Sequence, residues 1–84
     1  MADELHISSL VVHSRPEREA VIAERLAGMA GLEIHASSGG KLVITLETAT
    51  ETEVVERLTA IQLLEGVLSA TLVFHHLEPR SEGS

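Results

Sequence analysis

Four segments of this chain alternate strongly apolar side chains with small or polar ones, a pattern that restricts them to β-strands with one buried face. The segments are residues 5–13, 32–37, 41–47 and 67–77. Successive side chains of a strand point to opposite faces, so the apolar set of each segment can pack under other elements. Between the segments, apolar residues recur at the spacing of an amphipathic helix: Ile22, Leu26 and Met29, then Val54, Leu58 and Ile61.

The resulting order is strand, helix, strand, strand, helix, strand. It predicts an α+β, ferredoxin-like βαββαβ domain. Its four-stranded antiparallel sheet would have the order 4-1-3-2, with both helices on one face and the other face open. At 84 residues a single domain is expected. We assign it to residues 5–77 and expect residues 78–84 to form a disordered tail.

Local signals mark the ends of these elements. Ser14 and Glu17 have the spacing of a capping box at the start of the first helix, and Thr50 and Glu53 repeat it at the second. Gly39–Gly40 predicts a tight turn between the two middle strands, because glycine tolerates positive φ. The middle strands should therefore form a hairpin.

Composition limits the possible partners and locations. Thirteen acidic and six basic residues give a net charge of −7, which makes nucleic acid a poor partner and favours a basic one. There is no cysteine, and residues 1–4 have no feature of a signal peptide. No apolar run approaches the length of a membrane span, so no membrane insertion is expected. We expect a cytoplasmic location.

The open face of the sheet is the predicted binding surface. It lacks the charged residues usual on a solvated strand face, having a flat, moderately apolar centre with acids and imidazoles toward its margins. By strand parity it comprises Ile7, Ser9, Val11, His13, Glu33, His35, Val43, Thr45, Glu47, Ser69, Thr71, Val73 and His75.

No pattern of catalytic or metal-binding residues is present. The chain has no nucleophile motif, and the five histidines are not spaced to converge on a metal. His6 and His75 are expected on opposite faces of the sheet. Arg15 and Arg18 precede a helix as in acylphosphatases, but the glycine-rich phosphate loop is missing and Pro16 removes a donor. We predict no enzyme activity, no metal and no cofactor.

The last strand would be a long edge without proline and without acidic or basic residues other than histidine. Such an edge can accept another strand, so the sequence leaves open a weak homodimer through residues 67–77, or addition of a peptide strand.

Four motifs together resemble the NapD family. They are Ser8–Ser9–Leu10–Val11–Val12, the Gly-Leu-Glu-Ile entry to the second strand (31–34), the Lys-Leu-Val-Ile third strand (41–44), and Glu-Gly-Val-Leu-Ser-Ala-Thr-Leu-Val-Phe-His-His (65–76). The similarity covers roughly residues 7–76. NapD proteins are cytoplasmic chaperones that mature the catalytic subunit of periplasmic nitrate reductase.

The resemblance implies binding of the twin-arginine signal peptide of the nitrate reductase precursor, which delays export until cofactors are inserted into that client. The residues agree with it. Ile7, Val11, Val43 and Val73 suit an apolar segment, and Glu33 or Glu47 can pair with arginine. Small-ligand sensing, as in regulatory domains of the amino-acid-binding type that share this topology, is the alternative function.

Overall fold

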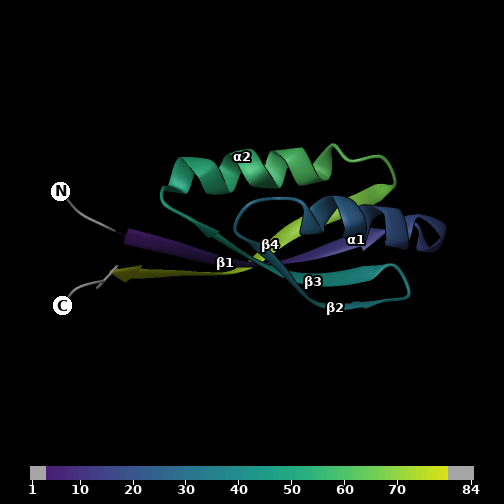
Figure 1. Cartoon of the computed structure of the whole chain (residues 1–84), viewed down its shortest axis with the longest axis horizontal. Coiled ribbons are helices and arrows are strands. Elements are labelled where there is room, and N and C mark those ends of the chain that lie inside the picture. Colours follow the sequence, from purple (N-terminus) through teal and green to yellow (C-terminus); the bar gives the residue numbers. More distant parts are fainter. Residues whose placement is uncertain (1–3, 80–84) are drawn as a thin grey trace.

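A computed structural model describes residues 4–79 as one antiparallel sheet covered on one face by two helices (Figure 1). The strands are β1 (Glu4–Ser14), β2 (Leu32–Ser38), β3 (Lys41–Thr48) and β4 (Val67–Pro79). The helices are α1 (Glu19–Ala27), which follows a short 3₁₀ turn η1 (Pro16–Arg18), and α2 (Glu51–Gln62). The strand order β2-β3-β1-β4 is the predicted order listed from the opposite edge, and the ferredoxin-like fold is confirmed.

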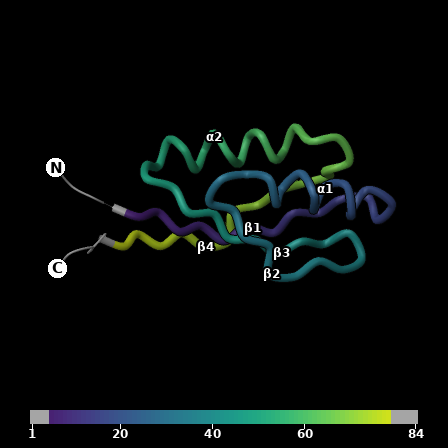
Figure 2. Tube along the Cα trace, in the orientation of Figure 1, coloured from purple at the N-terminus to yellow at the C-terminus, as the bar shows by residue number. Residues whose placement is uncertain are grey.

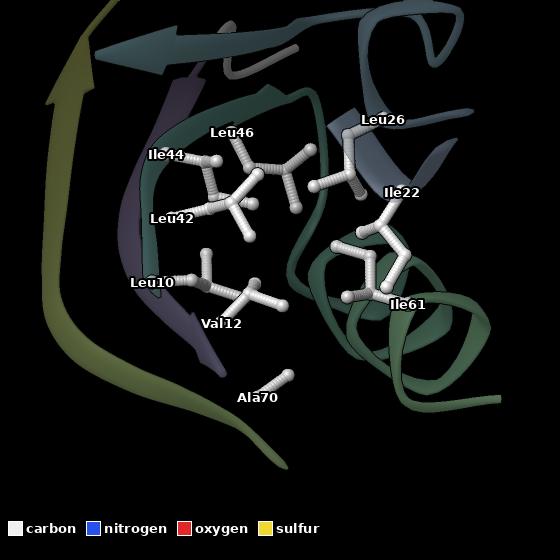
Figure 3. Packing of buried hydrophobic residues seen from close by; sticks show 9 residues of the cluster. All are labelled: Leu10, Val12, Ile22, Leu26, Leu42, Ile44, Leu46, Ile61 and Ala70. Atoms are coloured by element: carbon white, nitrogen blue, oxygen red, sulfur yellow. The ribbon is translucent and has the colours of Figure 1, made fainter. Parts of the chain in front are cut away.

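The core lies between the two helices and the central strands and is entirely aliphatic (Figure 3). Its members are Leu10 and Val12 from β1, Leu42, Ile44 and Leu46 from β3, Ile22 and Leu26 from α1, Ile61 from α2 and Ala70 from β4. These residues are the ones that alternation and helical spacing bring to the covered face. No helix formed by residues 4–79 lies on the opposite face of the sheet (Figure 1).

A β-bulge interrupts each outer strand near the middle of the sheet. In β2, Ile34 lies opposite Ile44 but Ala36 lies opposite Val43, so His35 is an extra residue. In β4, Phe74 lies opposite Ser9 but Leu72 lies opposite Leu10, so Val73 is extra. A bulge shifts the alternation of side chains by one residue. Beyond each bulge the outer strand therefore presents the opposite set of side chains from the set that strict parity predicts.

Strand β4 is longer than predicted. It continues to Pro79, two residues past Leu77, and Glu4 pairs with Pro79 at its end. The described ends of the chain therefore run side by side at one end of the molecule (Figure 2). The rest of the predicted tail, residues 80–84, lies outside the described residues.

The predicted caps have different outcomes. Thr50 caps α2 as expected, because its hydroxyl accepts the Glu53 N–H at 3.1 Å. The expected capping box of Ser14 and Glu17 is wrong. Ser14 is a buried residue of β1 whose hydroxyl donates to the carbonyls of Arg15 and Gly40, at 3.2 and 3.4 Å. The backbone N–H of Ser14 also donates to Gly40, which holds the end of β1 against the β2–β3 turn.

Glu19, the first residue of α1, connects that helix to the β2–β3 hairpin. One carboxylate oxygen accepts the Gly40 N–H at 2.7 Å, and the other accepts the Ser37 hydroxyl. The hydrogen bond from Ser37, and after it the one from Gly40, lowers the pKa of Glu19 below its ordinary value of 4.5. Both bonds favour the ionised carboxylate in the folded state.

This lowered pKa predicts a pH-dependent contribution to stability. Because the carboxyl binds its proton less tightly when folded, its contribution is present above pH 4.5 and is lost as pH falls through the folded-state pKa. The E19Q variant should be less stable than the unaltered protein at neutral pH, and the difference should shrink well below pH 4.5. Urea unfolding at both pH values would measure it, with the exposed Glu24→Gln on the same helix as control. A gap that does not depend on pH would contradict this account.

Candidate functional site

The open face, defined as the sheet face not covered by α1 and α2, is set by the strand register. Residues directly opposite one another in paired strands share a face, and Ser8, Leu10 and Val12 mark the covered one. The open face comprises Ile7, Ser9, Val11 and His13 of β1, Lys41, Val43, Thr45 and Glu47 of β3, Glu33, His35, Ala36 and Ser38 of β2, and Ser69, Thr71, Phe74, His76 and Glu78 of β4.

The centre of the open face is a low floor of short side chains. Ser9 and Thr45 lie opposite each other, and Val11 lies opposite Val43 in the next row. All four are only half-buried, although no element of the described chain covers them. Phe74, opposite Ser9 on β4, stands beside this floor with 57% of its surface exposed. The floor is therefore a shallow, largely uncharged surface with a single aromatic side chain at its margin.

Eleven of the thirteen predicted site residues lie on the open face, and the position predicted for His75 is wrong. Val73 is the extra residue of the β4 bulge. His75 follows it and lies opposite the buried Ser8, on the covered face. The prediction assigned every second residue of the last strand, counted from Val67, to the open face. That assignment is correct along the whole strand only if β4 pairs with β1 without a bulge.

His6 and His75 also depart from the prediction, because they share the covered face. The Nδ1 atom of His6 lies 3.2 Å from Nε2 of His75, while the ring centres are 5.3 Å apart and the rings are within 13° of parallel. The two rings therefore meet edge to edge in nearly one plane, as in an N–H···N hydrogen bond between a donor and an acceptor imidazole. Within residues 4–79, no group of three or more potential ligands is placed to hold a metal ion.

Sequence reasoning missed three β4 residues of the open face: Phe74, His76 and Glu78. Parity placed Phe74 with the core, but the bulge turns it outward. The run Leu72–Val73–Phe74 places three apolar residues in succession, which strict alternation with polar residues does not produce. That run is a local signal of the change of face at Val73.

Charge is distributed unevenly along the open face. Glu33 lies at the β2 edge in the row of Ser9 and Thr45, and Glu47 and Glu78 lie nearer the end where Glu4 pairs with Pro79, whereas Lys41 and His13 form a cross-strand pair at the other end. Within the described part of the chain, no lysine or arginine side chain lies within 4.0 Å of any of the three carboxylates. Among residues 4–79, the ionisable groups in contact with them are histidines, His35 at 3.8 Å from Glu33 and His76 at 3.5 Å from Glu78.

A hollow of about 230 Å³ lies between two of these carboxylates. It is lined by Gly31, Leu32, Glu33, Thr45 and Glu47. Gly31 has a φ of 77°, and a Cβ atom there would overlap the Glu47 carbonyl oxygen. The Gly31 carbonyl also accepts the Glu47 N–H at 2.8 Å. Glycine thus allows the chain to pass close to β3 beside this hollow, whose two acidic walls suit a cationic group.

A second hollow, of about 220 Å³, lies on the helix side. It is lined by Arg18, Val21, Ile22, Arg25, Leu63, Leu64 and Glu65. Within this hollow, Arg18 pairs with Glu65 at 3.8 Å. Arg25 also lines it, so the charge of the hollow differs from that of the acidic hollow on the open face. Two arginines make this hollow unsuitable for a basic partner.

Comparison with known proteins decides the family. The family model described as NapD protein matches residues 5–79. The chain belongs to the NapD family. A Chaperone NapD from Paracoccus pantotrophus is 45% identical to it over 78 residues, covering 93% of this chain and 70% of that protein. Chaperone NapD of Escherichia coli strain K12 is 30% identical over 78 residues, with 90% of each chain covered.

The architecture agrees with this family. The solution structure of the E. coli Tat proofreading chaperone protein NapD superposes with a TM-score of 0.82 and 28% identity, covering all of this chain and 90% of that one. The chain is therefore a NapD-type chaperone with the ferredoxin-like fold. The names of these relatives describe chaperones rather than enzymes. No helix among residues 4–79 is long and apolar enough to cross a membrane.

Proposed function

We propose that this chaperone acts in the cytoplasm, where it binds the twin-arginine signal peptide of a periplasmic nitrate reductase precursor and delays export until the cofactors of that client are inserted. Membership of the NapD family and similarity to a Tat proofreading chaperone support the proposal. The relatives are named as chaperones, which favours this function over small-ligand sensing.

The observation that best supports this proposal is that the charged and apolar parts of the open face match those of the peptide. A twin-arginine signal peptide has a basic segment followed by an apolar one. Glu33 and Glu47 line a hollow at one end of the face, with no lysine or arginine of the described chain to neutralise them. The floor of Ser9, Val11 and Val43 lies next to it. An amphipathic helix laid on this face would place its arginines at the hollow and its apolar side on the floor.

Strand addition at the edge of β4 is the competing mode of binding. Bulges at Leu68 and Val73 interrupt the regular spacing of that edge, and the Gln62 side chain of α2 donates to the Ala70 carbonyl at 3.1 Å. Bulges are a common device for discouraging strand addition. The geometry therefore favours the open face for the peptide, and a homodimer through β4 stays a prediction.

The experiment that tests this function is calorimetric titration with a synthetic twin-arginine signal peptide of a nitrate reductase. A peptide with both arginines replaced by glutamine runs in parallel. We expect saturable binding of the first peptide and clearly weaker binding of the second. No heat and no thermal shift with the first peptide would refute the function, and stabilisation by free amino acids would then support the sensor.

Neutralising the hollow should weaken this binding. The E33Q/E47Q double variant removes two exposed carboxylates, each worth about 0.5–1 kcal/mol to a bound cation at low salt. The dissociation constant should therefore rise about 5- to 30-fold. The loss should shrink at high salt because exposed charges are screened. Glu24→Gln on α1 removes one negative charge from the other side of the molecule and should leave the affinity unchanged; an equal loss per charge would show that only net charge matters.

A further inference from the structure

Three alternate residues of β4 form a ladder on the open face: Phe74, His76 and Glu78. The rings of Phe74 and His76 are within 13° of parallel, with centres 6.2 Å apart. The next side chain, Glu78, lies with Oε2 at 3.5 Å from Nε2 of His76. The bulge at Val73 creates this ladder, because without it these residues would face the helices.

Packing does not explain why an aromatic residue stands here. Phe74 is the only Phe, Tyr or Trp of the chain, yet it lies outside the aliphatic core and is 57% exposed. Contiguous exposed apolar surface is a common feature of binding sites, and Phe74 lies in the row between Ile7 and Val11 of the open face. The next two side chains of the ladder after Phe74 are the flat ring of His76 and the carboxylate of Glu78.

A flat cation suits this sequence of groups. A guanidinium is planar, stacks on aromatic faces and donates two parallel hydrogen bonds to a carboxylate. An ammonium group carries the same charge but cannot stack as a plane. The rings of Phe74 and His76 offer faces for stacking, and Glu78 supplies the counter-charge beyond them. The ladder should therefore distinguish arginine from lysine.

The ladder and the acidic hollow lie on opposite sides of β1. Glu47 of β3 and His76 of β4 both lie opposite Ile7, so they occupy the same row of the open face. Two strand spacings separate them, about 10 Å. Two neighbouring arginines of a peptide bound over Ile7 can extend their side chains in opposite directions to these two positions.

We infer that the ladder of Phe74, His76 and Glu78 is a second guanidinium subsite, which takes one arginine of the bound peptide while the Glu33/Glu47 hollow takes the other. The inference rests on the proposed function. It assigns separate recognition to each arginine, and it explains an exposed aromatic residue that the fold itself does not use.

A calorimetric double-mutant cycle tests the inference. The peptides are the twin-arginine signal peptide and two versions in which the first or the second arginine is replaced by lysine, which keeps the charge. The proteins are the unaltered chain, F74L and E78Q. One of the two lysine peptides lacks the arginine that the ladder holds. The unaltered chain should bind that peptide about two- to fivefold more weakly than the twin-arginine peptide, because lysine does not stack on the rings of the ladder. F74L should cause a similar loss with the twin-arginine peptide but no further loss with that lysine peptide.

The control is Val55→Ala on α2, a side chain with 58% exposure that lies on the helix side of the sheet. It should change no affinity, and all variants should keep the thermal midpoint of the unaltered protein. E78Q should weaken binding of the twin-arginine peptide as well. If F74L weakens all three peptides equally, or if neither F74L nor E78Q weakens any of them, the subsite is refuted although the chaperone function stands. If the unaltered chain does not bind the twin-arginine peptide, the function and the subsite both fail.

Discussion

Truncating Leu10 to alanine should lower the free energy of unfolding by about 2–5 kcal/mol. Leu10 is fully buried at the centre of β1, within an aliphatic core drawn from two other strands and two helices. The loss includes the transfer of the missing methyl groups and the cavity that rigid neighbours leave unfilled. A domain of this length has a total stability of about 4–12 kcal/mol, so the variant should be close to unfolding at 37 °C.

The matched control is Leu72→Ala, because Leu72 lies directly opposite Leu10 on β4 and faces the same side of the sheet. Its side chain is 41% exposed, so truncation leaves no closed cavity. The loss should stay below about 1.5 kcal/mol. Urea unfolding of both variants gives the comparison. Similar losses would mean that β4 carries as much of the core as the central strands, contrary to the burial pattern.

The parts of the fold that depend on uninterrupted periodicity were predictable. Leu42, Ile44 and Leu46 alternate without a break along β3, and the same holds for Leu10 and Val12 on β1. These central strands pair with each other in register from His6 to His13, with no bulge. Parity therefore assigned the open-face residues of both central strands correctly.

The outer strands were less predictable because one extra residue reverses the sheet face on which every later side chain of the strand lies. Strand parity is a cumulative count, so the bulge at Val73 moved His75 to the covered face and brought Phe74 and His76 to the open face. The bulge at His35 similarly turned Ala36 outward and Ser37 toward the helix side, where its hydroxyl reaches Glu19. Neither bulge contains the glycine that often marks one.

The start of α1 was mispredicted for a different reason. Ser14 has the spacing of a cap, but a local motif competes with tertiary hydrogen bonding for the same hydroxyl. The strand β1 extends to Ser14, and the carbonyls of Arg15 and Gly40 accept its hydroxyl instead. The hairpin turn that supplies the Gly40 carbonyl lies 26 residues away, so a local pattern could not reveal it.

Replacing Ser9 by arginine should weaken binding of the twin-arginine peptide about 100-fold or more, roughly 2.8 kcal/mol. Ser9 lies at the centre of the open face, between Thr45 and Phe74 in the same row. A long side chain there would rise above the low floor and obstruct any helix or strand laid across it. Its guanidinium can also reach Phe74 and the acidic end of the face, where it would compete with the arginines of the peptide.

The fold should tolerate Ser9→Arg, since the open face leaves the new side chain free to extend into solvent. Ala60→Arg on α2 adds the same charge at an exposed helix position and should leave the affinity unchanged. Calorimetry with the thermal midpoint of each variant separates lost binding from lost folding. If Ser9→Arg binds as well as the unaltered chain, the peptide does not occupy the open face. The irregular edge of β4 would then become the expected site, and the acidic hollow would need another ligand.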